Sequence, residues 1–261
     1  LREMYRKTFE RLDRQGRIDE AVFVLGELLN ARQECLDYLE RHGRHAQAAE
    51  LALAWDMPTA TIVRLLLLAD DWERALQVAR RDGQFGDAVL ALEKTRPELA
   101  VKLRLLWGES LADRGEWLAA VDAVWPVPQA RNLAIEWLRI AEDAGAALSA
   151  RALVRRAEKL PDTLEKYGER ILALAQPGEG EQAEISAAAR SALADALLDV
   201  KQRNPAVAGI ANALLPAIAA DRAAGRNALG KSRLNKLLSL GGDPYLKADL
   251  PAWQLPTASK R

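Results

Sequence analysis

The sequence has few of the residues that build disulfides, metal sites and histidine-based catalysis. Its 261 residues include one cysteine, Cys35, and two histidines, His42 and His45. A single cysteine cannot form an internal disulfide, which fits a reducing compartment. The three residues match no familiar zinc spacing, and the chain has no G-x-S-x-G motif. We therefore expect neither a metal or cofactor site nor a catalytic triad.

Strand-forming residues are also sparse, because Ala, Leu, Arg and Glu dominate the chain. These four are strong helix formers, so the composition predicts an all-α protein. The longest apolar run, from Leu65 to Ala69, is far shorter than the roughly 18 residues of a membrane helix. No signal peptide is recognisable at the start of the chain. We predict a cytoplasmic protein with no membrane partner.

Charge is balanced overall but unevenly distributed. Residues 1–200 contain 27 Lys and Arg against 34 Asp and Glu, whereas residues 201–261 contain 10 against 3. Nucleic-acid binding would favour aromatics among the basic residues, and none lies between residues 222 and 244. We expect this basic segment to be solvated, or docked on the acidic body or on an acidic partner. Nucleic acid is the less favoured partner.

A short phrase recurs along the first 160 residues. A turn residue is followed two positions later by a residue that is usually bulky, and five positions later by Ala, as in GEWLAA from Gly115. Glycine accepts the left-handed conformation that ends a helix, and residues three apart share one face of the next helix. Each copy therefore predicts the elbow of a helical hairpin. The turn residues and their alanines are Gly16 and Ala21, Gly43 and Ala48, Asp70 and Ala75, Gly83 and Ala88, Gly115 and Ala120, and Gly145 and Ala150.

Prolines mark the other end of the repeating unit. Pro97, Pro128 and Pro161 each precede a helical pattern, at intervals of 31 and 33 residues. Proline is well tolerated at the first position of a helix. Two helices in a period of this length are typical of an α-solenoid, although the earlier spacings are shorter and irregular.

One stretch carries a family resemblance. Residues 104–124, RLLWGESLADRGEWLAAVDAV, resemble a tetratricopeptide repeat, with Gly108, Leu111, Gly115 and Ala120 at its small, large, turn and small positions. Arg104 departs from the family, which has tryptophan there. The irregular lengths also resemble the degenerate helical repeats that follow β-propellers in larger scaffold proteins, including bacterial ones. The resemblance implies stacked antiparallel hairpins and protein partners.

The predicted organisation has three parts. Residues 1–175 form a TPR-like helical-repeat array, residues 181–240 form C-terminal helices that continue or cap the solenoid, and residues 241–261 form an extended, proline-rich tail. The break near residues 176–181 contains one proline and two glycines, which are turn and loop residues. It is either a domain boundary or a long loop within one solenoid.

The segment GRNALGKS, from Gly225 to Ser232, has the spacing of a phosphate-binding P-loop. That chemistry needs a strand before the first glycine and a helix after the lysine. An alanine-rich helical pattern precedes Gly225, and no apolar strand ending in Asp follows to hold a metal ion. We interpret the match as accidental, so no nucleotide or other small-molecule substrate is expected.

Other residues have ordinary structural interpretations. Acidic pairs such as Glu142 and Asp143 are expected at helix ends or on polar faces, where solvation explains them. Trp117 and Trp137 are predicted to be core residues, whereas Trp55 precedes a proline-started helix and could pack inward or contact a partner.

The function predicted is a non-catalytic protein–protein interaction scaffold, a module of a larger cytoplasmic assembly. The alternative is a regulatory or nucleic-acid-binding module that uses the basic C-terminal segment. Aromatic residues are favoured interface anchors, and the tail is too rich in proline to fold alone. We predict partner contacts through Tyr245, Leu250, Trp253, Arg226 and Arg233.

Overall fold

The computed structural model describes residues 1–176, 180–226 and 229–249, and within these ranges the chain forms sixteen α-helices and no strand. The predicted all-α class is confirmed. The chain divides into two compact units, Leu1–Trp107 and Gly108–Arg261, whose boundary lies within helix α8 (Pro97–Ala112). The break expected near residues 176–181 lies inside the second unit.

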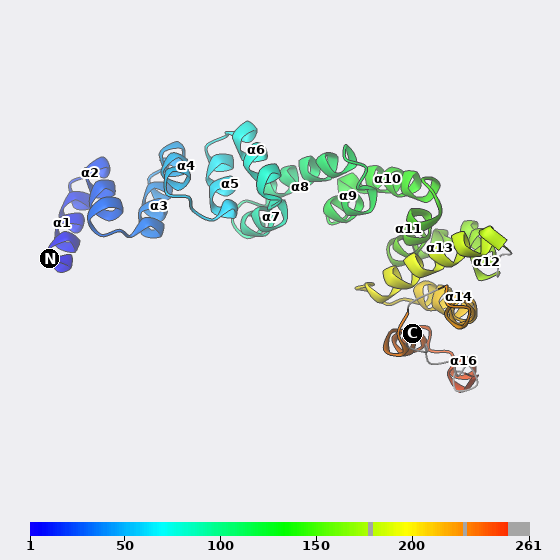
Figure 1. Cartoon of the computed structure of the whole chain (residues 1–261). Coiled ribbons are helices and arrows are strands. Elements are labelled where there is room, and N and C mark those ends of the chain that lie inside the picture. Colours follow the sequence, from blue (N-terminus) through cyan, green and yellow to red (C-terminus); the bar gives the residue numbers. More distant parts are fainter. Residues whose placement is uncertain (177–179, 227–228, 250–261) are drawn as a thin grey trace. The chain divides into compact units, whose positions relative to one another are not determined.

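Unit 1 is built from helices that pack mainly on their neighbours in sequence. α3 packs on α4, α4 on α5, and α5 on both α6 and α7 (Figure 1). Its elements are α1 (Arg2–Arg14), α2 (Ile18–Phe23), the π-helical turn η1 (Val24–Leu28), α3 (Arg32–Arg41), α4 (His45–Ala54), α5 (Thr59–Leu68), α6 (Trp72–Asp82), α7 (Phe85–Glu93) and the first part of α8.

The predicted elbows are confirmed. Every turn residue of the repeated phrase has a positive φ, and every alanine five positions later is buried. Gly83, with φ 67°, ends α6, and Phe85 then begins α7. Asp70 replaces glycine at φ 60°, and its carboxylate accepts a hydrogen bond from the indole of Trp72 at 2.9 Å. Asp is one of the few residues other than Gly that tolerate this conformation.

Trp55, whose environment the sequence left open, packs inward in unit 1. A Cβ atom placed on Gly26 would lie 2.9 Å from Cζ2 of Trp55, so only glycine lets the ring approach η1 so closely. Phe85 stacks on Trp107 with ring centroids 6.1 Å apart. These aromatic residues fill the space between hairpins of unit 1.

Unit 2 begins with sequential packing and then becomes a bundle. α9 packs on α10 and α10 on α11, but α11 then packs extensively on α13, and α12, α14 and α15 join them. After the last residues of α8, its elements are α9 (Trp117–Val124), η2 (Pro128–Ala130), α10 (Arg131–Asp143), α11 (Ala146–Lys159), η3 (Pro161–Tyr167), α12 (Gly168–Ala175), α13 (Gly180–Leu198), α14 (Pro205–Ala223), α15 (Lys231–Gly241) and α16 (Pro244–Asp249).

Helix α14 is the central element of the bundle. By length and composition it could cross a membrane, although the longest run of consecutive apolar residues in the sequence is far shorter than a membrane helix. Its apolar residues, among them Ile210, Leu214 and Ile218, are buried in a core shared with residues of α13 and α15. The side chain of Asn204 caps its first turn by accepting a hydrogen bond from the N–H of Val207 at 2.9 Å, which stabilises the helix start. This packing is that of a core helix.

The prediction that the tail is extended from residue 241 is wrong for its first part. α15 continues to Gly241, and Pro244–Asp249 form the short helix α16. Asp243 Oδ1 accepts hydrogen bonds from the N–H groups of Tyr245 and Leu246 at 2.8 and 3.3 Å. Asp followed by Pro is a favourable helix start. This local signal forms α16, although more prolines follow later in the tail. The rest of the tail, including Leu250 and Trp253, lies outside the described residues.

Candidate interaction surface

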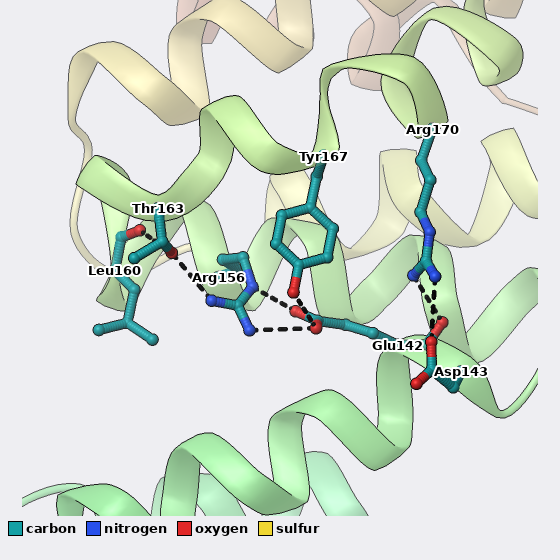
Figure 2. A network of polar contacts seen from close by, with 7 residues as sticks. All are labelled: Glu142, Asp143, Arg156, Leu160, Thr163, Tyr167 and Arg170. Carbon is teal, nitrogen blue, oxygen red and sulfur yellow. Dashed lines mark hydrogen bonds and ion pairs between the residues drawn. The ribbon is translucent and has the colours of Figure 1, made fainter.

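A buried polar network supports the first half of unit 2 (Figure 2). Arg156 of α11 donates to both carboxylate oxygens of Glu142 at the end of α10, with a distance of 3.0 Å from Nη2 to Oε2. Tyr167 of η3 donates to the same Oε2 at 2.8 Å, and Arg156 Nη1 donates to Thr163 Oγ1 at 2.8 Å. Arg170 of α12 reaches the backbone oxygen of Glu142 at 3.2 Å. The network therefore joins α10, α11, η3 and α12.

Glu142 was expected to be solvated, and that expectation is wrong, because only 2% of its surface is exposed. Its charge is compensated by an arginine 14 residues further along the chain. Burial, together with the hydrogen bond to Glu142, raises the pKa of Tyr167. A carboxylate held by a bidentate arginine has both of its oxygens engaged in hydrogen bonds. The arrangement supports the fold and offers no free base.

A second buried ion pair holds the bundle together. Arg190 of α13 donates to both oxygens of Asp221 on α14, at 2.5 and 2.8 Å. Its remaining Nη1 donates to the backbone oxygens of Leu174 and Gln176 at 3.0 and 3.1 Å. The Arg190 side chain is fully buried. Its hydrogen bonds connect the end of α12 with α14.

Unit 2 carries an open groove of about 810 Å³ at the elbow between α8 and α9, which we call the aromatic groove. Leu133, Trp137 and Ile140 of α10 line it at helical spacing, so they form one apolar stripe. Trp117, the first residue of α9, completes the apolar wall. The lining residues are Glu109, Ala112, Asp113, Arg114, Gly115, Trp117, Leu133, Glu136, Trp137 and Ile140.

A close approach of helices shapes this groove. A Cβ atom on Gly108 of α8 would lie 2.4 Å from Cγ1 of Val124 and 3.0 Å from Cζ3 of Trp137. Only glycine at this position lets α8 lie so close to α9 and α10. Trp137 is consequently held against the α8 backbone, with 7% of its surface exposed.

The rim of the aromatic groove is acidic. Glu109, Asp113 and Glu136 are exposed carboxylates, and Arg114, the one arginine among the described lining residues, pairs with Glu116 at 3.1 Å. The sequence assigned Trp117 and Trp137 to the core and did not predict a groove beside them. Glu109 lies in the last turn of α8, and Asp113 follows four residues later, just after the helix ends. This spacing was the signal that could have indicated the rim.

A second groove, of about 770 Å³, lies between the end of α13 and one face of α15, and we call it the basic groove. Lys231 and Ser232 of the P-loop-like segment line it. The element that precedes Gly225 is the helix α14, whereas a P-loop requires a strand there. Gly225 has φ 72°, as expected for a residue that follows a helix end. The lining residues are Leu197, Leu198, Val200, Arg203, Lys231, Ser232, Asn235, Lys236, Ser239 and Leu240.

The structure describes three of the five predicted partner-binding residues. Tyr245 on α16 is 80% exposed, whereas Arg233 forms an ion pair with Asp195 of α13. Arg226 lies 4.0 Å from the buried Asp221. Both arginines therefore contact acidic residues of this chain, and neither lines a groove described above. Leu250 and Trp253 are outside the described residues.

Cys35 is in the core of unit 1. Its Sγ lies 3.7 Å from the backbone oxygen of Val22, and burial raises the pKa of the thiol to about 11. His42 contacts the ring of Tyr38, with centroids 4.4 Å apart. In the part of the chain that the structure describes, no three His, Cys, Asp or Glu residues are grouped to hold a metal ion.

Comparison of the chain with known protein families, with curated proteins and with solved structures gave no match. Its function has to be inferred from its own residues.

Proposed function

We propose that this chain is a non-catalytic protein–protein interaction scaffold, a TPR-like α-solenoid module of a larger cytoplasmic assembly. The repeated elbow and the neighbour-to-neighbour packing of unit 1 support a repeat array, because solenoid repeats contact mainly their neighbours. The identity of the repeat and the larger assembly are parts of this proposal.

The aromatic groove is the observation that carries the proposal. It combines two tryptophans, an apolar stripe and an open surface, and aromatic residues in such settings anchor interfaces. The buried carboxylates of Glu142 and Asp221 are bound by arginines, whereas those of the groove rim are exposed. A groove of this kind favours recognition by shape and charge.

The rim defines the kind of partner. Glu109, Asp113 and Glu136 surround apolar side chains, so a complementary segment has apolar residues flanked by Lys or Arg. Charge complementarity of this type mainly sets specificity and the association rate.

Site-specific photo-crosslinking tests the proposal. A photoreactive benzoylphenylalanine replaces Ile140 in the aromatic groove, and a control chain carries it at Leu172, an exposed apolar residue of α12 outside both grooves. In cells that produce the chain, position 140 should crosslink a defined protein and position 172 should not.

A charge reversal supplies the second arm of this test. Glu109→Lys with Glu136→Lys should reduce the crosslink at position 140 about tenfold, because two rim carboxylates become cations. An identical crosslinking pattern from both positions, or a crosslink that the reversal leaves intact, would contradict the proposal. Nucleotide titration of the wild type against Lys231→Ala tests the competing enzyme hypothesis, which requires a binding signal that the substitution abolishes.

A further inference from the structure

The basic groove is formed by one face of α15. Lys231, Asn235 and Ser239 follow each other at intervals of four residues, with Ser232, Lys236 and Leu240 beside them. Side chains at this spacing lie on one side of a helix. The opposite side of α15 is buried in the bundle through Leu234, Leu237 and Leu238. Within the described part of the chain, the groove face is therefore the side of α15 that is not buried in the bundle.

The charge of the groove has one sign. Arg203, Lys231 and Lys236 are exposed, and no Asp or Glu is among its described lining residues. Among the described residues, the ion pairs around α13, α14 and α15 join Arg190, Arg226 and Arg233 to Asp221 or Asp195. None of these pairs involves the three groove cations, Arg203, Lys231 and Lys236. Like charges gathered in a groove attract an anionic partner and are screened by salt.

The floor of the groove is apolar. Leu198, Val200 and Leu240 are each partly exposed, and Leu197 is buried. Nucleic acid would be favoured by aromatic rings on which bases stack, and none of the lining residues that the structure describes is aromatic. Aliphatic side chains between cations instead match a segment that carries both apolar and acidic residues.

We propose that the basic groove binds an acidic amphipathic segment of a partner protein. Its carboxylates contact Arg203, Lys231 and Lys236, and its apolar side chains cover Leu198, Val200 and Leu240. The site is separate from the aromatic groove and of opposite charge, so the scaffold would hold two partners of different chemistry. Failure at either groove would leave the other proposal standing.

Fluorescence anisotropy with the whole chain tests this inference. The probe is a fluorescein-labelled peptide, LEELLEELLEELLE, which presents leucine and glutamate on opposite faces of a helix. Two matched peptides remove one feature each, with every Glu replaced by Gln in one and every Leu replaced by Ala in the other. At about 50 mM salt the probe should bind, and affinity should fall as salt rises because exposed charges are screened. Both matched peptides should bind about tenfold more weakly or not at all.

Variants of the chain locate the binding site. Lys231→Glu with Lys236→Glu should weaken probe binding about tenfold, because attraction becomes repulsion at two sites. Lys166→Glu with Lys247→Glu makes the same change in net charge at exposed residues outside the groove, and it should change the affinity by less than about twofold. Leu240→Ser should weaken binding without changing the charge. Circular dichroism melts verify that each variant is folded.

Several results would overturn the inference. These are no binding of the probe, equal binding of the alanine peptide, or equal weakening by the two double charge reversals. Tighter binding of an oligothymidine of about 20 nucleotides, unaffected by Leu240→Ser, would assign the groove to nucleic acid instead. Self-association that Lys231→Glu with Lys236→Glu abolishes would make a second copy of the chain the occupant.

Discussion

Gly108→Ala should destabilise unit 2, although alanine is the better helix former. The new methyl group would lie 2.4 Å from Cγ1 of Val124 and 3.0 Å from the ring of Trp137. Carbon atoms in good contact are about 3.5–4.0 Å apart, so more than about 1 Å of overlap has to be relieved. Either α8 moves away from α9 and α10, or both side chains leave their packed positions.

The magnitude follows from two opposing contributions. Overpacking of a core costs about 1–3 kcal/mol, and the contacts with two side chains place Gly108→Ala near the upper end. Replacing a helical glycine by alanine returns about 1 kcal/mol. The net loss is about 2 kcal/mol, which for a unit of this size lowers the melting temperature by about 4–8 °C.

Gly209→Ala is the matched control. Gly209 also lies in a helix, α14, but no heavy atom is within 4 Å of the position that its Cβ would take. This substitution should stabilise the chain by about 0.5–1 kcal/mol. Urea unfolding followed by circular dichroism measures both variants. If Gly108→Ala stabilised the chain as much as Gly209→Ala does, the close approach of α8 to α9 and α10 would be wrong.

Three further predictions concern buried polar groups. Asp221→Ala should cost about 3–5 kcal/mol in urea unfolding, because it leaves the buried Arg190 charge unpaired. The double variant Arg190→Met with Asp221→Leu should cost less, because it leaves no unpaired charge in the core. An equal cost would show that the unpaired Arg190 charge is not the cause of the loss. Tyr167→Phe should cost about 1 kcal/mol by removing the hydrogen bond to Glu142. Because the pKa of Tyr167 is raised in the folded state, its contribution should be present at neutral pH and be lost as pH rises above about 10, the unfolded value. A loss in Tyr167→Phe that persists above the folded pKa would be inconsistent with this linkage. With a thiol pKa of about 11, Cys35 should resist a disulfide reagent at pH 8 until urea exposes it. Rapid stoichiometric labelling of the native chain would show that the thiol is accessible.

The local signals in the sequence predicted much of unit 1. A turn residue and an alanine five positions later concern one helix end and one helix start, which neighbouring residues determine. For this reason the elbows at Gly16, Gly43, Asp70 and Gly83 were found from their spacing. Gly108 also matched the small position of the repeat, and its contact with Val124 gives the physical reason for a small residue there.

The buried ion pairs could not be predicted in the same way. Glu142 and Arg156 are 14 residues apart, and Arg190 and Asp221 are 31 apart. Their pairing depends on which helices meet in the bundle, and that is decided by tertiary packing. The first part of the tail was mispredicted for a local reason, because the start signal of Asp243 and Pro244 was given less weight than the prolines that follow.

The grooves were missed because each joins residues from separate elements. Trp117 was predicted to be a core residue from its elbow position and Trp137 from its apolar stripe, and Trp137 is indeed buried. Neither signal shows whether a core residue also borders an open groove, because that depends on the path of α8 beside it. Likewise, Arg203 and Lys236 come from opposite sides of α14 in the sequence and meet only when α13 and α15 pack together.

The packing of unit 1 has a mechanical consequence. Because α3 and α4 contact mainly their neighbours in sequence, pulling on the chain can detach one hairpin while its neighbours stay folded. In the bundle of unit 2, Arg190 ties α12, α13 and α14 together, so these helices have to separate at once. Under tension, unit 1 would therefore unfold hairpin by hairpin, whereas the bundle of unit 2 would stay folded and then unfold in a single cooperative step.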